Sequence, residues 1–462
     1  MCRRVWLSLP FAVFASSAIA FGQVREPATL RPARDSAGID SARTWSRGVR
    51  FDLPLLDVPY NTKFGARAPS MQQSLEITAG VYDIAHRAIV RPFGSHTKIA
   101  KVTITAFDIF GTTLPFADAW LHEEWHRAIL GNRGVDSRND VYLLKLLAPT
   151  ISVSHVSDEA LTAFKAQHPA EFVRIKEAGI EGEYALITRL EKERFYNGAH
   201  SWNTALYWLT TLGAVIYVGD TTGTDKATDD MNAEEPTVAG RDISGHDFTA
   251  WVRDLFRPTE PYAAHGLHPT GVGINRYTKT TDLTLEERAY LHKEGRLGLL
   301  NFVDPNLLGL HGFNVWSPAN GAPLRMNFAL RHQLTSFGHA IDANVFLKRG
   351  ATNLFVVLHT YDNDAHHALP GVDAELLDVP ITLKGHALDV SPRIAAWIQP
   401  AGQAFRVTNT QAGGLAALRI GAPLSKRIGA LFEVEAKTAG WVAGVAQLDK
   451  AVNARVGVST VP

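Results

Sequence analysis

Two histidines one helical turn apart, His122 and His126, are the residues of this chain best placed to do chemistry. Residues four apart lie on the same face of an α-helix, so both imidazoles can point at one metal ion. Glu123 follows the first histidine directly. There its carboxylate can take a proton from a water molecule that the metal holds. This H-E-x-x-H pattern predicts a centre that activates water, with Glu123 as its catalytic base.

The flanking residues predict the helix that must carry this pattern. Pro115 favours a helical φ near the helix start, and Gly131 follows the last apolar turn as a stop signal. We therefore expect a helix from Phe116 to Leu130. Without a metal, the same residues would be two histidines on an ordinary amphipathic helix.

A catalytic zinc site needs a third protein ligand and leaves its fourth position to water. The only cysteine is Cys2, and no third histidine continues the motif, so the ligand must come from elsewhere. A second helix is expected over Glu171 to Arg194, and Glu183 falls among its apolar residues. A carboxylate there is costly unless it is paired or bound to metal, which favours Glu183 as the third ligand.

Glu181 falls on the opposite side of the same predicted helix and is the alternative ligand. Gly179 and Gly182 lie on either side of it in the sequence. Because glycine has no side chain, these two positions predict that another helix packs closely here.

The H-E-x-x-H pattern, followed further along the chain by the helical Glu183-Tyr184-Ala185, resembles the gluzincin branch of the zinc metallopeptidases. The resemblance implies a zinc ion (Zn2+) held by His122, His126 and Glu183, and a peptide or protein substrate. It covers residues 100–195 at most. Ile187 stands where several such families carry an aspartate, so the exact family is left open.

The resemblance also implies a strand just before the motif helix that binds the substrate. Lys101 to Ile109, in which Val102, Ile104 and Ala106 alternate with other residues, is placed to be that strand.

Composition and the N-terminus restrict the other function classes. Lysine plus arginine and aspartate plus glutamate each total 46, so no net charge favours nucleic acid. Arg3 and Arg4, the apolar run Val5 to Phe14 and the small residues of Ala18-Ile19-Ala20 predict a signal peptide in residues 1–22. We expect an exported protein of the periplasm or outer membrane, with a flexible lead-in over residues 23–50.

The hydrophobic periodicity of the remaining chain changes once, from helical to alternating, and this predicts an α+β fold. Helical periods dominate residues 51–318, the expected metal-binding domain, whereas residues 319–462 alternate apolar and polar side chains as antiparallel strands do. The expected C-terminal domain is a β-meander that closes into a barrel, either soluble or in an outer membrane. Ser201 to Gly219 is free of charged residues and fits a membrane span or a buried helix equally well.

The sequence therefore predicts an exported zinc-dependent metallohydrolase, and more specifically a peptidase. The alternative is an outer-membrane or envelope β-barrel protein whose helical part is a plug or scaffold, with a structural metal or none. A two-histidine, one-carboxylate iron site is a third reading of the same ligands, in which Glu123 has no evident role.

Overall fold

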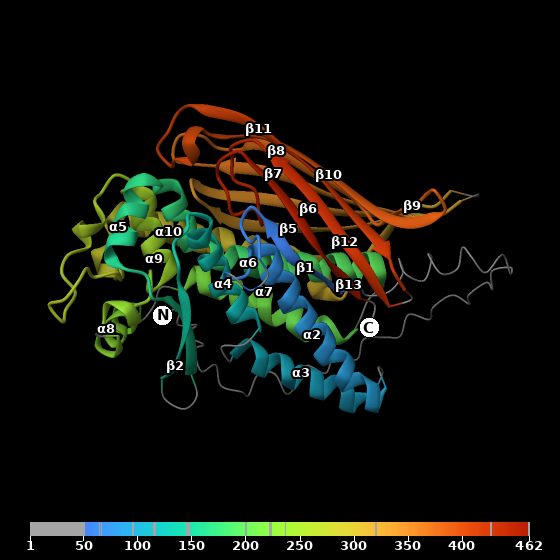
Figure 1. Cartoon of the computed structure of the whole chain (residues 1–462), viewed down its shortest axis with the longest axis horizontal. Coiled ribbons are helices and arrows are strands. Elements are labelled where there is room, and N and C mark those ends of the chain that lie inside the picture. Colours follow the sequence, from blue (N-terminus) through green and yellow to red (C-terminus); the bar gives the residue numbers. More distant parts are fainter. Residues whose placement is uncertain are drawn as a thin grey trace.

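The computed structural model describes residues 51–462 except 64, 66, 95–96, 114–116, 145–147, 199–200, 221–223, 236, 319–320, 426 and 461–462. The predicted signal peptide, the lead-in and Pro115 lie outside the described residues. The described chain is an α+β protein in which a curved antiparallel sheet lies over a group of helices (Figure 1).

The helices come first along the chain, as the sequence predicts. Capping boxes begin two of them, with Ser70 and Gln73 before one and Thr284 and Glu287 before the other. The helices are α2 (Met71–Phe93), α3 (Lys98–Thr113), α4 (Ala117–Asn132), α5 (Asp158–Gln167), α6 (Pro169–Asn197), α7 (Thr204–Gly219), α8 (Thr224–Glu234), α9 (Asp247–Phe256) and α10 (Leu285–Leu297).

The strands form one large sheet and a separate hairpin. The hairpin pairs β2 (Arg138–Leu144) with β3 (Ala148–Ser154). The 11-stranded sheet has the order β1-β13-β12-β11-β10-β8-β7-β6-β5-β4, with β9 paired to β10. Its strands are β1 (Phe51–Val58), β4 (Phe313–Trp316), β5 (Leu324–Thr335), β6 (Gly338–Arg349), β7 (Thr352–Asp362), β8 (Leu369–Leu377), β9 (Val379–Leu383), β10 (His386–Pro400), β11 (Thr410–Pro423), β12 (Ile428–Lys437) and β13 (Ala451–Thr460).

The predicted antiparallel meander in residues 319–462 is confirmed, but a barrel is not shown. Among the described strands the order runs from β1 to β4 without closing. One outer strand also comes from the other end of the chain, since Phe51 of β1 pairs with Thr460 of β13. Sequence reasoning placed residues 51–58 with the helical part because no local pattern reveals a partner so far along the chain.

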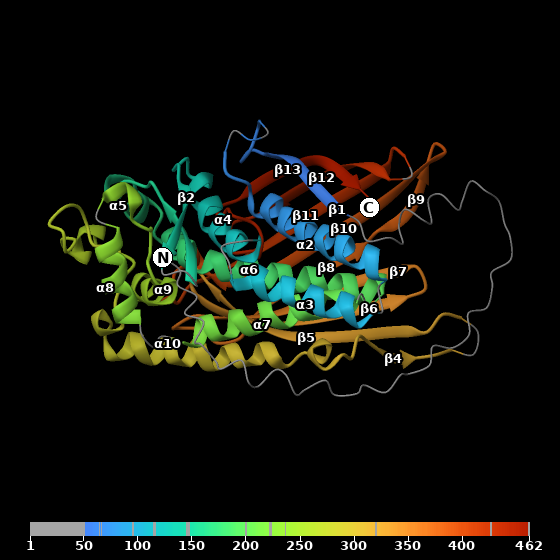
Figure 2. The ribbon, with the colours of Figure 1, turned by 90° about the horizontal axis from the view of Figure 1, so that it is seen from below.

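Helix α6 runs beneath the sheet with α4 beside it, while α2 packs against the outer strand β1 and α3 lies on the side away from the sheet (Figures 1 and 2). The main core forms where α4, α6 and α9 meet, around the fully buried Trp125, Leu186 and Trp251. Because these helices are buried on several sides, their positions are fixed by packing against one another.

The predicted substrate strand over Lys101 to Ile109 is wrong, because these residues belong to α3. The apolar alternation there reflects β-branched residues, which tolerate a helix when tertiary contacts favour it. Ala100, Ile104 and Asp108 lie four apart and are all buried, which is helical spacing. Asp108 also pairs with His86 of α2 at 2.5 Å, which ties this face of the helix to the core.

The uncharged segment that the sequence left open between a span and a buried helix forms α7, which packs against α3, α6 and α10. Leu206, Tyr207 and Ala214 are fully buried in that packing. Among the described helices, none combines the length and the hydropathy that a membrane crossing requires.

Candidate metal centre

The motif helix α4 and the long helix α6 approach each other at the two glycines that the sequence singled out. A Cβ atom at Gly179 would overlap the Nε2 atoms of both His122 and His126. A Cβ atom at Gly182 would lie 3.0 Å from the Trp125 ring. The predicted close approach is therefore confirmed, and the absent side chain at Gly179 leaves room for the two imidazoles.

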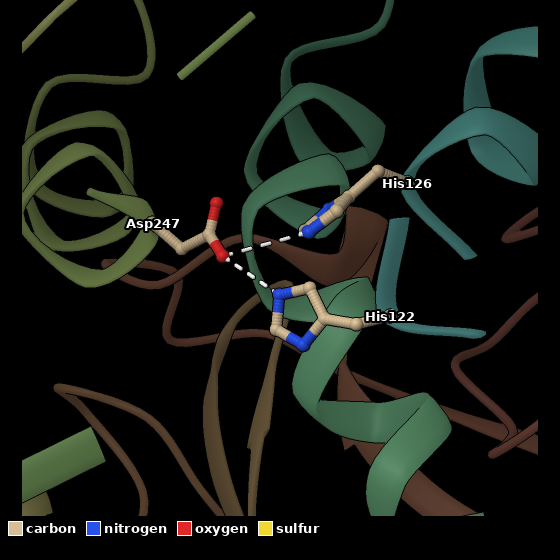
Figure 3. Close-up of side chains that lie close together, drawn as sticks. All are labelled: His122, His126 and Asp247. Atoms are coloured by element: carbon tan, nitrogen blue, oxygen red, sulfur yellow. Dashed lines mark hydrogen bonds and ion pairs between the residues drawn. The ribbon is translucent and has the colours of Figure 1, made fainter. Parts of the chain in front are cut away.

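His122, His126 and Asp247 bring three ligand atoms together at this place (Figure 3). Asp247 Oδ2 lies 3.1 Å from His122 Nε2 and 3.5 Å from His126 Nε2. The three atoms all lie within 4.8 Å of one another, and all three side chains are buried. Two imidazoles and one carboxylate are donors that zinc prefers.

The other ring nitrogen of each histidine has an acceptor of its own. His126 Nδ1 contacts the carbonyl oxygen of Ile175, and His122 Nδ1 lies 3.0 Å from Glu183 Oε1. A carbonyl can only accept a hydrogen bond, so His126 carries a proton on Nδ1 and directs Nε2 toward Asp247. Outer partners of this kind fix the tautomer and orientation of metal-binding histidines.

Glu183, the third ligand expected from the sequence, thus lies beside the ring nitrogen of His122 that faces away from Asp247. Glu181, the alternative, lies elsewhere: it accepts from Arg174 at 3.0 Å and from the backbone N–H of Gly444 at 2.7 Å. The structure places Glu183 beside His122, but Asp247 and not Glu183 lies at the point where the two Nε2 atoms converge.

Asp247 is the residue that sequence reasoning missed. Asp247 is the first residue of helix α9, where an acidic side chain is common for reasons of helix polarity alone. Its carboxylate also accepts hydrogen bonds from Tyr217 at 2.8 Å and Ser244 at 2.9 Å. Burial raises the pKa of Asp247, but the nearby His126 and His122 outweigh burial and hold it well below its usual range.

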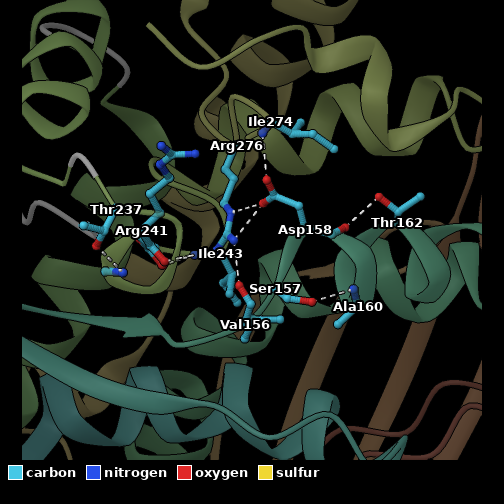
Figure 4. A network of polar contacts seen from close by, with 12 residues as sticks. Val156, Ser157, Asp158, Ala160, Thr162, Thr237, Arg241, Ile243, Ile274 and Arg276 are labelled. Carbon is cyan, nitrogen blue, oxygen red and sulfur yellow. Dashed lines mark hydrogen bonds and ion pairs between the residues drawn. The ribbon is translucent and has the colours of Figure 1, made fainter. Parts of the chain in front are cut away.

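A polar network fixes the loop that leads into α9 (Figure 4). Asp158, at the start of α5, accepts hydrogen bonds from Arg276 at 2.8 Å and from the backbone N–H of Ile274 at 2.7 Å. Arg276 donates in turn to the carbonyl oxygens of Val156 and Arg241. The network ties the segment just before Ser244 and Asp247 to the residues that follow β3. These contacts hold the start of α9, and with it Asp247, against α4.

Glu123 is 2% exposed and lies next to this group on α4. Burial raises the pKa of its carboxyl group above its usual value, and the neighbouring His126 and His122 offset this only in part. A buried carboxylate beside two imidazoles is a reasonable general base, because such groups act best when their pKa moves toward neutrality.

The residues fit a bound metal ion on an observation independent of the motif. His126 Nε2 is buried and makes no hydrogen bond within the described part of the chain. Its contact with Asp247 Oδ2, at 3.5 Å, is longer than an ordinary hydrogen bond, and coordination of both atoms to one metal ion would satisfy them better. The missing side chain at Gly179, which leaves room for both imidazoles, fits the same interpretation.

A second group of the same residue types lies where α10 meets the hairpin of β5 and β6, and it comprises Glu294, His332 and His339. His332 Nε2 lies 2.7 Å from Glu294 Oε2, and His339 Nδ1 lies 3.2 Å from Glu294 Oε1. Each imidazole therefore has its own carboxylate oxygen. His332 Nδ1 has no hydrogen-bond partner among the described residues, so no outer acceptor sets its tautomer.

Comparison of the chain with protein-family models, curated proteins and solved structures finds no match.

Proposed function

We propose that this chain is a zinc-dependent metallohydrolase and, more specifically, a peptidase. The observation that carries the proposal is the convergence of His122 Nε2, His126 Nε2 and Asp247 Oδ2 within 4.8 Å of one another. The two histidines lie on α4, which also carries Glu123, and Asp247 comes from α9. Three protein ligands with a neighbouring glutamate form the arrangement of a hydrolytic zinc site.

In this proposal Asp247 is the third ligand, and Glu183 is an outer partner that orients His122. Two distances support the assignment: Asp247 Oδ2 is 3.1 Å from His122 Nε2, while Glu183 Oε1 is 3.0 Å from Nδ1 of the same ring. One imidazole cannot direct both nitrogens at a single ion, so only one of the two carboxylates shares the ion with His126 Nε2.

A zinc ion held here would polarise a substrate carbonyl and lower the pKa of its water to about 7. Glu123 would serve as the general base toward that water and as the acid toward the leaving amine. Tyr217 and Ser244 keep the Asp247 carboxylate oriented. Ile175 and Glu183 hold the two imidazoles in position, so the reacting geometry does not depend on mobile side chains.

A structural metal in an envelope protein is the second candidate, and the burial of the group favours it. His122, His126 and Asp247 are each at most 4% exposed among the described residues, as in closed structural sites. Under this candidate the helices are a scaffold beneath the sheet, which could become a barrel only if β1 and β4 came to pair. An iron centre remains a third use of the same donors, and Glu123 favours hydrolysis over it.

The proposed protein is exported, acts in the periplasm or outer membrane and takes a peptide or protein as substrate. Its net charge of zero gives no reason to expect nucleic acid as a partner.

The deciding experiment compares the parent with Glu123→Gln in a peptide-library digest, with the zinc content of both proteins measured. The variant should keep its fold and its metal, because the amide has the same shape and position 123 is not a ligand. Turnover should fall by roughly 10²–10⁴-fold, because an amide cannot accept the proton.

Cleavage that is equal in the two proteins and insensitive to chelator would come from a contaminant and would contradict the proposal. Failure of a zinc-loaded parent to bind a hydroxamate, which needs an open coordination position, would favour the structural-metal candidate.

A further inference from the structure

Strands β12 and β13 turn apolar side chains outward and charged side chains toward the molecule. On β12, Phe432 is 44% exposed, whereas Glu435 is 2% exposed. On β13, Val456 is 48% exposed, whereas Arg455 is 5% exposed. An antiparallel sheet with one face in water normally shows the opposite polarity, with apolar residues toward the core.

The apolar outer face continues across the sheet. Strand registers join one row of outward residues from β5 to β13, and each of them is apolar. This row consists of Phe328, Val345, Val356, Ala374, Ile394, Ala416, Ala436 and Val452. Leu358, Val372 and Ile398 continue the exposed apolar surface on the neighbouring positions of β7, β8 and β10.

The inner face carries charged groups that pair with one another. Arg393 donates to Asp373 at 2.6 Å, and Arg455 lies 3.2 Å from Asp57. Both arginines line a cavity of about 290 Å³ between the sheet and α6. The sheet therefore keeps paired charged groups on its inner side and apolar groups on its outer side.

The outer face is larger than the apolar surface of an ordinary soluble protein. Eight adjacent strands spaced about 4.8 Å apart, with about ten residues each at about 3.3 Å, give an area on the order of 1,000 Å². The largest apolar patch on a typical monomer is about 300–600 Å².

We propose that this outer face of the sheet contacts the hydrocarbon of a lipid bilayer. The outward row contains no charged or hydrogen-bonding side chain, whereas protein interfaces have a polar rim and direct hydrogen bonds. Strands of 10 to 15 residues in β10 to β13 match the length that lipid-facing strands need, about 9–11 residues.

A second copy of the chain fits this surface less well. The sheet curves around α6, so its outer side is convex (Figure 1). Two convex rigid faces would touch over only part of the row, while a fluid bilayer can follow the curve. The proposal does not depend on the metal chemistry, since every residue that carries it lies on the sheet.

The test is flotation of the full chain with phosphatidylcholine vesicles at about 1 M salt, where electrostatic attraction is screened within about 3 Å. The test variant is Phe432→Glu with Val456→Lys and Ile394→Glu. Residues 432 and 456 are paired in the register, so their opposite charges face each other and the strands can still form. The parent should float, and the variant should float at least tenfold less.

The matched control changes two exposed apolar residues outside the sheet, Leu285→Glu and Leu267→Lys, and should float like the parent. Circular dichroism and thermal melting establish that each variant is folded. A parent that stays at the bottom of the gradient would overturn the proposal, as would a folded test variant that floats like the parent. Light scattering that shows a parent dimer, broken in the variant and unable to bind vesicles, would assign the face to a second copy.

A labelled position keeps the proposal testable if the triple variant does not fold. In a Cys2→Ser background, Val434→Cys carries a polarity-sensitive fluorophore, and Leu285→Cys is its control. Addition of the same vesicles should shift the emission at position 434 to shorter wavelength and leave position 285 unchanged. An equal response at the two positions, or none at 434, would overturn the proposal.

Discussion

The two histidine and carboxylate groups of this molecule contain the same residue types in different geometry. Around Asp247, both imidazoles direct Nε2 toward one carboxylate oxygen, at 3.1 and 3.5 Å. Around Glu294, the imidazoles of His332 and His339 approach different oxygens, at 2.7 and 3.2 Å. In the first group both imidazoles approach one oxygen atom, while in the second one carboxylate oxygen makes a hydrogen bond to His332 and the other an ion pair with His339.

The outer contacts explain the difference. His122 and His126 each have an acceptor at Nδ1, which presents Nε2 as a ligand. His332 instead uses Nε2 to reach Glu294, and its Nδ1 has no hydrogen-bond partner among the described residues. We therefore interpret the Asp247 group as the metal centre and the Glu294 group as a buried ion pair that joins α10 to the β5 and β6 hairpin.

Metal analysis of His126→Ala and His332→Ala should separate the two groups most strongly. His126→Ala should lose nearly all bound zinc, because two ligands do not hold the ion tightly. His332→Ala should keep its zinc but lose about 3–5 kcal/mol of unfolding free energy, because Glu294 is left as a buried charge. Elemental analysis and denaturant unfolding measure both quantities. Loss of metal from His332→Ala with retention in His126→Ala would reverse the assignment.

Within the Asp247 group, Asp247→Ala and Glu183→Gln distinguish a ligand from an outer partner. Asp247→Ala should weaken zinc binding more, because it removes a donor atom. Glu183→Gln should weaken it by about 10–100-fold, the usual effect of changing an outer partner of a ligand histidine. Competition with a chromogenic chelator gives both affinities. The opposite order would make Glu183 the ligand, as the sequence alone predicts.

The packing of both imidazoles against Gly179 allows a test of the same geometry with a smaller expected effect. Gly179→Ala should lower zinc affinity, because the new Cβ would meet His122 and His126 at their Nε2 atoms. Gly182→Ala is the control on the same helix, since its Cβ would meet the Trp125 ring at 3.0 Å and not the site. Chelator competition on both variants measures the effect. Equal affinities in the two variants would show that the packing of the imidazoles against Gly179 does not govern metal binding.

The smallest expected effect is a pH dependence confined to the Glu294 group. Burial raises the pKa of Glu294, but hydrogen bonds and charge from His332 and His339 outweigh burial and hold it well below its usual range. Its stabilisation is therefore present above the unfolded pKa of about 4.3 and is lost as the pH falls toward the folded value. Glu294→Gln should cost about 1.5–3 kcal/mol near neutral pH, and the difference from the parent should shrink below about pH 4.

Denaturant unfolding of the parent and Glu294→Gln at several pH values measures this dependence. A difference in unfolding free energy that stays constant between about pH 3 and 7 would mean that Glu294 does not titrate with folding.

Local signals in the sequence determined helices α4 and α6, the C-terminal strands and the two histidines of the site. The spacing of His122 and His126 fixes both on one face of α4, and the apolar period around Glu183 fixes α6. Gly179 and Gly182 correctly predict that the two helices touch, because close approach requires missing side chains. The alternation in residues 319–462 likewise predicts the antiparallel strands, since side chains in a strand alternate between two faces.

Tertiary structure alone decided which atoms converge and which face of the sheet is covered. A carboxylate can be a metal ligand or an outer hydrogen-bond partner of a ligand histidine. Only the fold places Glu183 at Nδ1 and Asp247 at Nε2 of His122. Asp247 lies on α9, far along the chain from α4, so no local period connects them. The alternation of side chains along β12 likewise puts Phe432 and Glu435 on opposite faces of the sheet. Which face is the inner one depends on α6, which lies on the charged side. Local spacing limits what neighbouring residues can do, while contacts between distant segments depend on packing that the spacing does not encode.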